Sequence, residues 1–238
     1  MRNVAAVFRR ELVGFFGQPL AYVALAIFLA MVAAFTLWFD DLLLSGVASM
    51  SIPFRWITVC FLFLVPATTM RSIAEERRTG SLEMIATLPM TPGELVVGKW
   101  LAAVVLVASA LALTFGYPVA LASLGTLDWG PVLGGYLGLL LVGASFASVG
   151  LAASSVTDAQ VMAFLLAFVA CLVPWLTTWF LPLVPGAWVP LVQYATIDYH
   201  YANLADGVLD SRSLVFFGAL VLVMLRFAVT VLEHRRLS

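Results

Sequence analysis

The sequence predicts an all-α polytopic membrane protein with six membrane-spanning helices. Of its 238 residues, 63% are hydrophobic and only 11% are charged, whereas about 45–50% of the residues of a soluble domain are apolar. The apolar residues gather in six runs, each about as long as the roughly 20 residues that a helix needs to cross a bilayer. These runs are residues 20–39, 52–70, 99–123, 131–153, 159–181 and 213–232. We expect them to form one transmembrane domain over residues 1–238, with kinks at Pro66, Pro118 and Pro174.

An amphipathic helix is predicted ahead of the first span, over residues 2–16. Arg9 and Arg10 point away from its apolar arc, and Glu11 interrupts that arc near its edge. The apolar arc consists of Val4, Val7, Phe8, Leu12, Phe15 and Phe16. Such a helix lies in the headgroup plane and forms an elbow where Pro19 breaks the chain. A positively charged anchor that sets the topology is a compatible interpretation.

The distribution of basic residues predicts the orientation of the six spans. If both termini are cytoplasmic, only Arg55 and Arg212 lie outside the cell. The cytoplasm then holds Arg2, Arg9, Arg10, Arg71, Arg77, Arg78, Lys99, Arg235 and Arg236. This bias follows the positive-inside rule. Arg226 lies within the last span, where snorkelling to the cytoplasmic side is the favoured interpretation and lining a substrate path is the alternative.

The first cytoplasmic loop, residues 71–98, carries a dense group of charges between residues 74 and 83. A short helix is predicted over Ile73–Leu88, and Thr91 to Glu94 fit a capping box at the start of a second short helix. The charges either solvate the loop or are kept for a partner, and the residues alone leave both interpretations open.

Several functional classes are excluded or disfavoured. A net charge of −1 gives no basic face for nucleic acid. Residues 93–99 match the spacing of a phosphate-binding loop, but Trp100 stands where that loop needs Ser or Thr. Ser145 has no histidine within any span to serve as a base. We therefore expect no enzyme activity, metal or cofactor in this chain.

A stripe of small residues in the fourth span predicts close helix approach. It comprises Gly130, Gly134, Gly138, Gly143 and Ala147. Packing within one subunit is the favoured interpretation, and a dimer seam is the alternative.

Three sequence features together resemble the permease subunits of type-2 ABC transporters. The segment 74–83 reads Ala-Glu-Glu-Arg-Arg-Thr-Gly-Ser-Leu-Glu, and it is followed by Leu88-Pro89 and by Gly98-Lys99 at the start of the next span. The N-terminal run with Arg10-Glu11-Leu12, Phe15-Phe16, Pro19 and Tyr22 is similar to gliding-motility (GldF-like) and nitrous-oxide-reductase-maturation permeases. The external segment 198–210, with His200, also resembles the gliding-motility branch.

The resemblance implies a permease of the cell (inner) membrane that couples ATP hydrolysis to outward substrate movement. Its implied partners are two copies of a separate ATPase, which binds ATP and magnesium, a second permease chain, and an accessory membrane or periplasmic subunit. The loop 71–98 would carry the coupling helix. The implied coupling residues are Glu75, Glu76, Arg77, Arg78, Thr79, Gly80, Ser81 and Glu83. The alternatives are a non-transporting mechanotransmission or scaffold subunit and, more weakly, a secondary transporter, which would be expected to carry acidic groups in mid-span.

Overall fold

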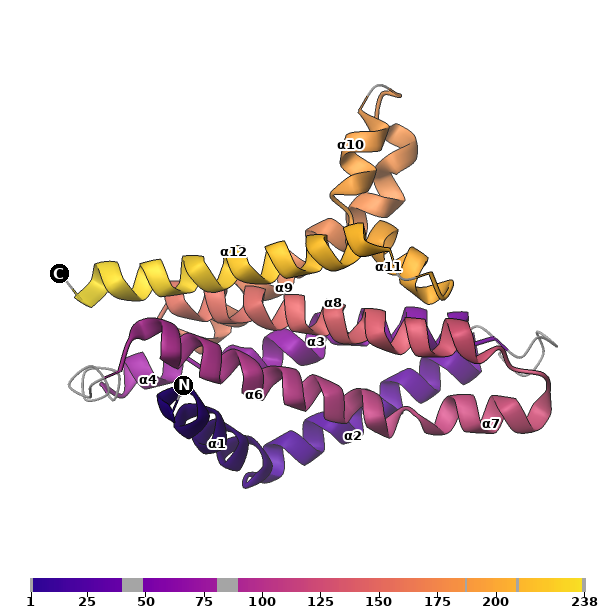
Figure 1. Ribbon diagram of the computed structural model, residues 1–238. Helices are drawn as coiled ribbons and strands as arrows, with labels where there is room; N and C mark the ends of the chain where they lie inside the picture. The colour runs from indigo at the N-terminus through magenta and orange to yellow at the C-terminus, as the bar shows by residue number, and fades with distance from the viewer. Residues whose placement is uncertain (1, 40–48, 81–89, 187, 209, 237–238) are drawn as a thin grey trace.

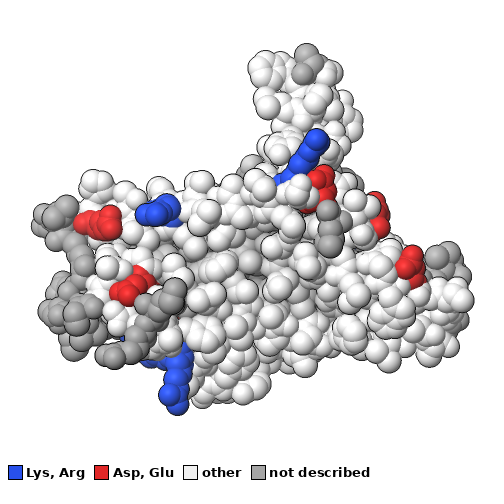
Figure 2. Space-filling view, in the orientation of Figure 1, with Lys and Arg blue, Asp and Glu red and all other residues white. Residues whose placement is uncertain are grey.

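The prediction of an all-α protein with six spans is confirmed. The computed structural model describes residues 2–39, 49–80, 90–186, 188–208 and 210–236, and every regular element in these ranges is a helix. Six of the described stretches are long and apolar enough to cross a membrane. They are Ala21–Trp38, Ser51–Arg78, Pro92–Ser123, Trp129–Val156, Gln160–Leu183 and Ser211–His234. On the face shown in Figure 2, charged side chains gather toward the two ends of the molecule and leave an uncharged belt between them.

The amphipathic helix is present with its predicted bounds, as α1 (Arg2–Phe16). It meets α2 (Pro19–Ala34) at an elbow that is visible in Figure 1. Gln18 is extended there, with φ −106° and ψ 140°, and Pro19 occupies the first position of α2, where a missing N–H costs nothing. A π-helical turn, η1 (Phe35–Phe39), continues α2.

The third span ends at Ser123 as predicted, but it begins earlier than predicted and is interrupted near its far end. The capping box is present, with the Thr91 hydroxyl accepting from the Glu94 N–H and the Glu94 carboxylate accepting from the Thr91 N–H. However, it opens the long helix α6 (Pro92–Leu113) rather than a separate short helix, because Leu95 and Val96 are buried and continue the apolar surface of the span. The span is then interrupted before α7 (Gly116–Leu124), where Pro118 has no N–H to offer the carbonyl of Thr114.

The helix α8 (Trp129–Val156) forms the centre of the bundle. In the 18-residue apolar stretch of α8, 78% of the residues are buried. The corresponding stretches of the spans formed by α9 (Gln160–Phe180) and α12 (Ser211–Arg236) are each only 17% buried. It packs against α3 (Ser51–Thr69), α6, α9, α11 (Ile197–Ala205) and α12. A 3-10 turn, η2 (Leu181–Leu183), and α10 (Val189–Tyr194) follow α9, and α10 stands away from the bundle (Figure 1).

The small residues of α8 pack within the chain, as the favoured interpretation predicts. A side chain at Gly134 would collide with the backbone carbonyl of Leu204 on α11. A Cβ atom at Gly138 would lie 3.0 Å from the ring of Tyr201, and one at Gly143 would collide with Val107 on α6. These glycines allow α11 and α6 to approach α8 closely.

The predicted helix over Ile73–Leu88 is not one continuous helix. Only α4 (Ala74–Arg78) is helical in the described part of this segment. Gly80 adopts a left-handed φ of 70°, a conformation that commonly ends a helix. Gly80 therefore lies beyond the end of α4 rather than near the centre of a helix. Ser81 and Glu83 lie outside the described residues.

Replacing Gly134 with Ala should destabilise the protein by about 1–3 kcal/mol, the usual cost of overpacking, because the new methyl group would meet the backbone of α11 rather than a flexible side chain. Gly130→Ala, one turn away, is the matched control, since its Cβ atom would lie 3.4 Å from Asp128 Oδ1. Thermal unfolding of the purified proteins measures the difference. Equal melting temperatures for the two variants would contradict this packing.

Candidate functional site

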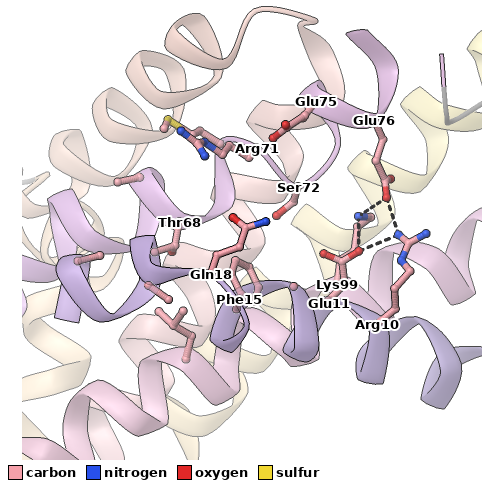
Figure 3. A pocket seen from close by; sticks show the side chains of 16 residues that line it. Arg10, Glu11, Phe15, Gln18, Thr68, Arg71, Ser72, Glu75, Glu76 and Lys99 are labelled. Atoms are coloured by element: carbon pink, nitrogen blue, oxygen red, sulfur yellow. Dashed lines mark hydrogen bonds and ion pairs between the residues drawn. The ribbon is translucent and has the colours of Figure 1, made fainter. Parts of the chain in front are cut away.

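A buried lysine joins three helices at the end of the bundle that holds α4. The side chain of Lys99, near the start of α6, is only 1% exposed. Its Nζ lies 2.8 Å from Glu11 Oε1 on α1 and 2.9 Å from Glu76 Oε1 on α4. Arg10 also donates to both carboxylates, at 2.7 Å for Glu11 (Figure 3). We call these four residues the Lys99 cluster; its two cations and two anions balance.

Local packing places α1 where Glu11 can reach Lys99. The residue before the lysine is Gly98, and a Cβ atom there would lie 2.8 Å from the side chain of Val7. The two helices are therefore in direct contact at this glycine. A second polar contact lies near the start of α6, where Asn3 Nδ2 donates to Glu94 Oε2 at 3.1 Å.

The environment of Glu11 favours its charged form. Burial alone would raise the pKa of this carboxyl, but the charge of Lys99 and the hydrogen bonds from Lys99 and Arg10 outweigh burial and hold the pKa below its ordinary value. Glu11 therefore stays an anion beside the lysine, as a buried ammonium group requires.

A second set of polar contacts fixes α4 to the end of α8. Ser154 Oγ accepts hydrogen bonds from the N–H groups of Ile73 and Ala74, at 3.1 and 3.0 Å, and donates to the Met70 carbonyl at 3.0 Å. The N–H groups at the start of a helix have no partner inside it, so Ser154 supplies one from another helix. The Arg77 guanidinium donates to Asp158 Oδ1 and to the Ser155 carbonyl, both at 2.8 Å.

The predicted coupling residues divide into an inward and an outward group. Glu76 and Arg77 point into the protein and bond to other helices. Glu75 is half-buried, and an exposed group is formed by Arg78, Thr79 and Gly80. We call the contacts of Glu76 and Arg77 with other parts of the chain the inward pairs. Neither interpretation of the charges, as solvating the loop or as binding a partner, predicted them. The sequence did carry a signal, because Glu11 on an apolar arc and Lys99 at the start of an apolar span both need a buried partner.

Arg226, the other predicted site residue, is exposed on α12. In the part of the chain that the structure describes, no ion pair or hydrogen bond joins its side chain to the Lys99 cluster, so its assignment to snorkelling stays a prediction. Among the described residues, no group of three or more His, Cys, Asp or Glu side chains could hold a metal ion.

A comparison with protein families finds a match. The family described as "ABC-2 family transporter protein" matches residues 41–197, which is 157 of the 238 residues. The matched segment contains α4, Lys99 and Ser154, whereas Arg10 and Glu11 precede it. No curated protein matches the chain.

Replacing Lys99 with Met should destabilise the protein by roughly 3–5 kcal/mol, the cost of removing one partner of a buried ion pair. A triple variant that adds Glu11→Gln and Glu76→Gln should regain much of this loss, because no carboxylate is then left without its cation. Arg9→Met, at an exposed position of α1, is the control. Thermal unfolding separates these cases, and a Lys99→Met protein that melts with the wild type would show that the cluster contributes little.

Proposed function

This chain belongs to the ABC-2 family of transporter proteins, and we propose that it is the membrane subunit of an ATP-driven exporter in which α4 receives the movement of a separate ATPase. The observation that carries this proposal is the attachment of α4. Within five residues, Ala74–Arg78, this helix bonds to α1 and α6 through Glu76 and to α8 through Arg77.

The attachments make α4 suited to passing on a displacement. A helix of five residues has no stability of its own, so its position depends on the polar contacts that hold it. Any force on its exposed side is delivered to the elbow helix, the third span and the central helix together. When the ATPase closes on ATP, the membrane helices shift toward their outward-open arrangement. The size of this shift depends on how much more tightly ATP binds the complex in the outward-open state than in the inward-open state.

The docking surface that we propose consists of Arg78, Thr79 and Gly80, which are exposed beyond the inward pairs, together with Ser81 and Glu83 that follow them. In a small interface that moves during each cycle, charges at the rim align the two protein surfaces. These charges stay in water, so the interface avoids the cost of burying them. ATP and magnesium bind to the ATPase in this scheme, and two ATPase copies serve two permease chains.

A second permease chain would cover apolar surface that a single chain leaves exposed. On α10, which stands away from the bundle (Figure 1), Leu191 is 64% and Tyr194 is 49% exposed. Exposed apolar patches of this kind mark protein or membrane contacts. We propose that this outer region, together with α2, contributes to a dimer contact within the inner membrane, and that an accessory subunit of a gliding-motility-like complex joins there.

The orientation that we propose places both termini and α4 in the cytoplasm. Reporter fusions after Trp129 and after Asp210 should then report an external position, and a fusion after Gly80 an internal one, because the positive-inside rule governs short loops. An external signal after Gly80 would overturn both the orientation and the docking of α4 to a cytoplasmic ATPase.

Reversing the exposed charge of α4 with Arg78→Glu should reduce co-purification of the cognate ATPase while leaving the melting temperature of the permease unchanged, because Arg78 lies outside the inward pairs. Arg9→Glu is the matched control, as an exposed arginine on α1. Undiminished ATPase recovery with Arg78→Glu would place the docking surface elsewhere. The mechanotransmission alternative makes a different prediction for the wild-type complex. If the permease binds the ATPase and stimulates its ATP hydrolysis but no substrate crosses the membrane, that alternative is favoured.

A further inference from the structure

A cavity of about 490 Å³ lies directly beside the Lys99 cluster. Its walls come from α1, the start of α2, the end of α3, the segment that leads into α4, α4 itself, and α6 (Figure 3). Protein interiors pack closely and rarely leave a void larger than a water molecule. This space between α1 and the bundle is partly open to its surroundings, so a molecule from those surroundings can enter it.

The cavity wall has an apolar part and a polar part. The apolar part is lined by three small side chains and three larger ones: Ala21, Ala24, Ala67, Phe15, Met70 and Leu106. Water has no hydrogen-bonding partners at such a surface. The polar part includes Gln18, Arg71, Ser72 and Glu75, which Figure 3 shows around one side of the cavity. The wall therefore suits a molecule with one polar and one apolar end.

Two of the charged side chains that line the cavity, Arg71 and Glu75, are available to bind a ligand. Of six charged lining residues, four belong to the Lys99 cluster and bond to one another. Within the described part of the chain, no ion pair or hydrogen bond engages the side chain of Arg71 or Glu75. The two residues are one helical turn apart, since the Glu75 N–H donates to the Arg71 carbonyl at 3.2 Å.

We propose that this cavity binds a phospholipid whose headgroup carries both a phosphate and a primary ammonium group. The Arg71 guanidinium matches the oxygens of a phosphate, and the Glu75 carboxylate accepts hydrogen bonds from the ammonium. Gln18 and Ser72 add further donors for the phosphate, and the lipid tail follows the surface of Ala21, Ala24 and Ala67.

The presence of both a free cation, Arg71, and a free anion, Glu75, also selects against other headgroups. An anionic headgroup without an ammonium group leaves Glu75 facing a phosphate of like charge, and a choline headgroup has no N–H to donate. The position suits a lipid because α1 lies at headgroup depth as an interfacial helix. A lipid held here touches both α4 and the elbow, so the lipid composition of the membrane would affect how firmly α4 is held.

The test uses the purified full-length protein without the ATPase, so its outcome is independent of the docking proposed above. The protein is equilibrated with vesicles of equal parts phosphatidylethanolamine, phosphatidylglycerol and phosphatidylcholine, and native mass spectrometry counts the lipids that each chain retains. The wild type should retain phosphatidylethanolamine about tenfold better than phosphatidylglycerol, since about 1.4 kcal/mol corresponds to a factor of ten. Excess inorganic phosphate should not displace the lipid, which distinguishes a lipid site from a phosphate site.

Two variants with matched controls localise the binding. Ala24→Leu fills the apolar part of the cavity, and Arg71→Ala removes its free cation; each should lower retention about tenfold. Ala26→Leu on α2 and Arg78→Ala on α4 are exposed and do not line the cavity, so both should retain the lipid. Arg71 is itself exposed, so its replacement remains informative if Ala24→Leu fails to fold. Equal retention of the two lipids by the wild type, or unchanged retention in Arg71→Ala, would overturn the proposal.

Discussion

The arrangement of this end of the molecule depends on the need to neutralise one buried ammonium group. Lys99 is almost fully enclosed at the start of a membrane helix, and a buried charge without a partner is far more costly than any packing contact that could replace it. Two carboxylates from different helices meet that need, and Arg10 balances the second negative charge. The positions of α1 and α4 relative to α6 follow from this requirement.

The same constraint helps to hold the short helix α4 in place. Alone, it would be too short to form, and its apolar contribution is small, since Ala74 is its one buried residue. Hydrogen bonds to Ser154 and Ser155 attach it to the central helix, and an ion pair joins it to Asp158 just beyond the end of that helix. Glu76 attaches it to the Lys99 cluster. A structural element held by directional polar bonds on several sides moves with its neighbours rather than independently, which is the property that the coupling role proposed above requires.

Much of the fold could be predicted because lipid leaves few alternatives. In the hydrocarbon core every backbone group must be bonded within the segment, so apolar runs of sufficient length become helices, and the amphipathic spacing of residues 2–16 fixed α1 to the residue. Local sequence signals predicted where helices begin better than they predicted how long the helices are. The capping box at Thr91 was real, yet the helix after it continued because Leu95 and Val96 are buried against neighbours that the sequence does not name. The roles of Glu76 and Arg77 were missed for a similar reason, since Glu76 pairs with Arg10, 66 positions away, and Arg77 pairs with Asp158, 81 positions away. Only the packing of the helices brings these residues together.

The most direct test of this account is the distance between α1 and the end of α8, measured with spin labels at two exposed positions, Arg9 and Val156. Neither label touches the proposed docking surface. If the Lys99 cluster and the contacts of α4 hold these helices as one block, the distance distribution should be narrow and should stay the same when the assembled complex binds ATP. The Lys99→Met variant should broaden that distribution. A wild-type distance that changes with nucleotide, or a distribution that Lys99→Met leaves unaltered, would contradict the central claim that a buried ion cluster holds α4 to the bundle.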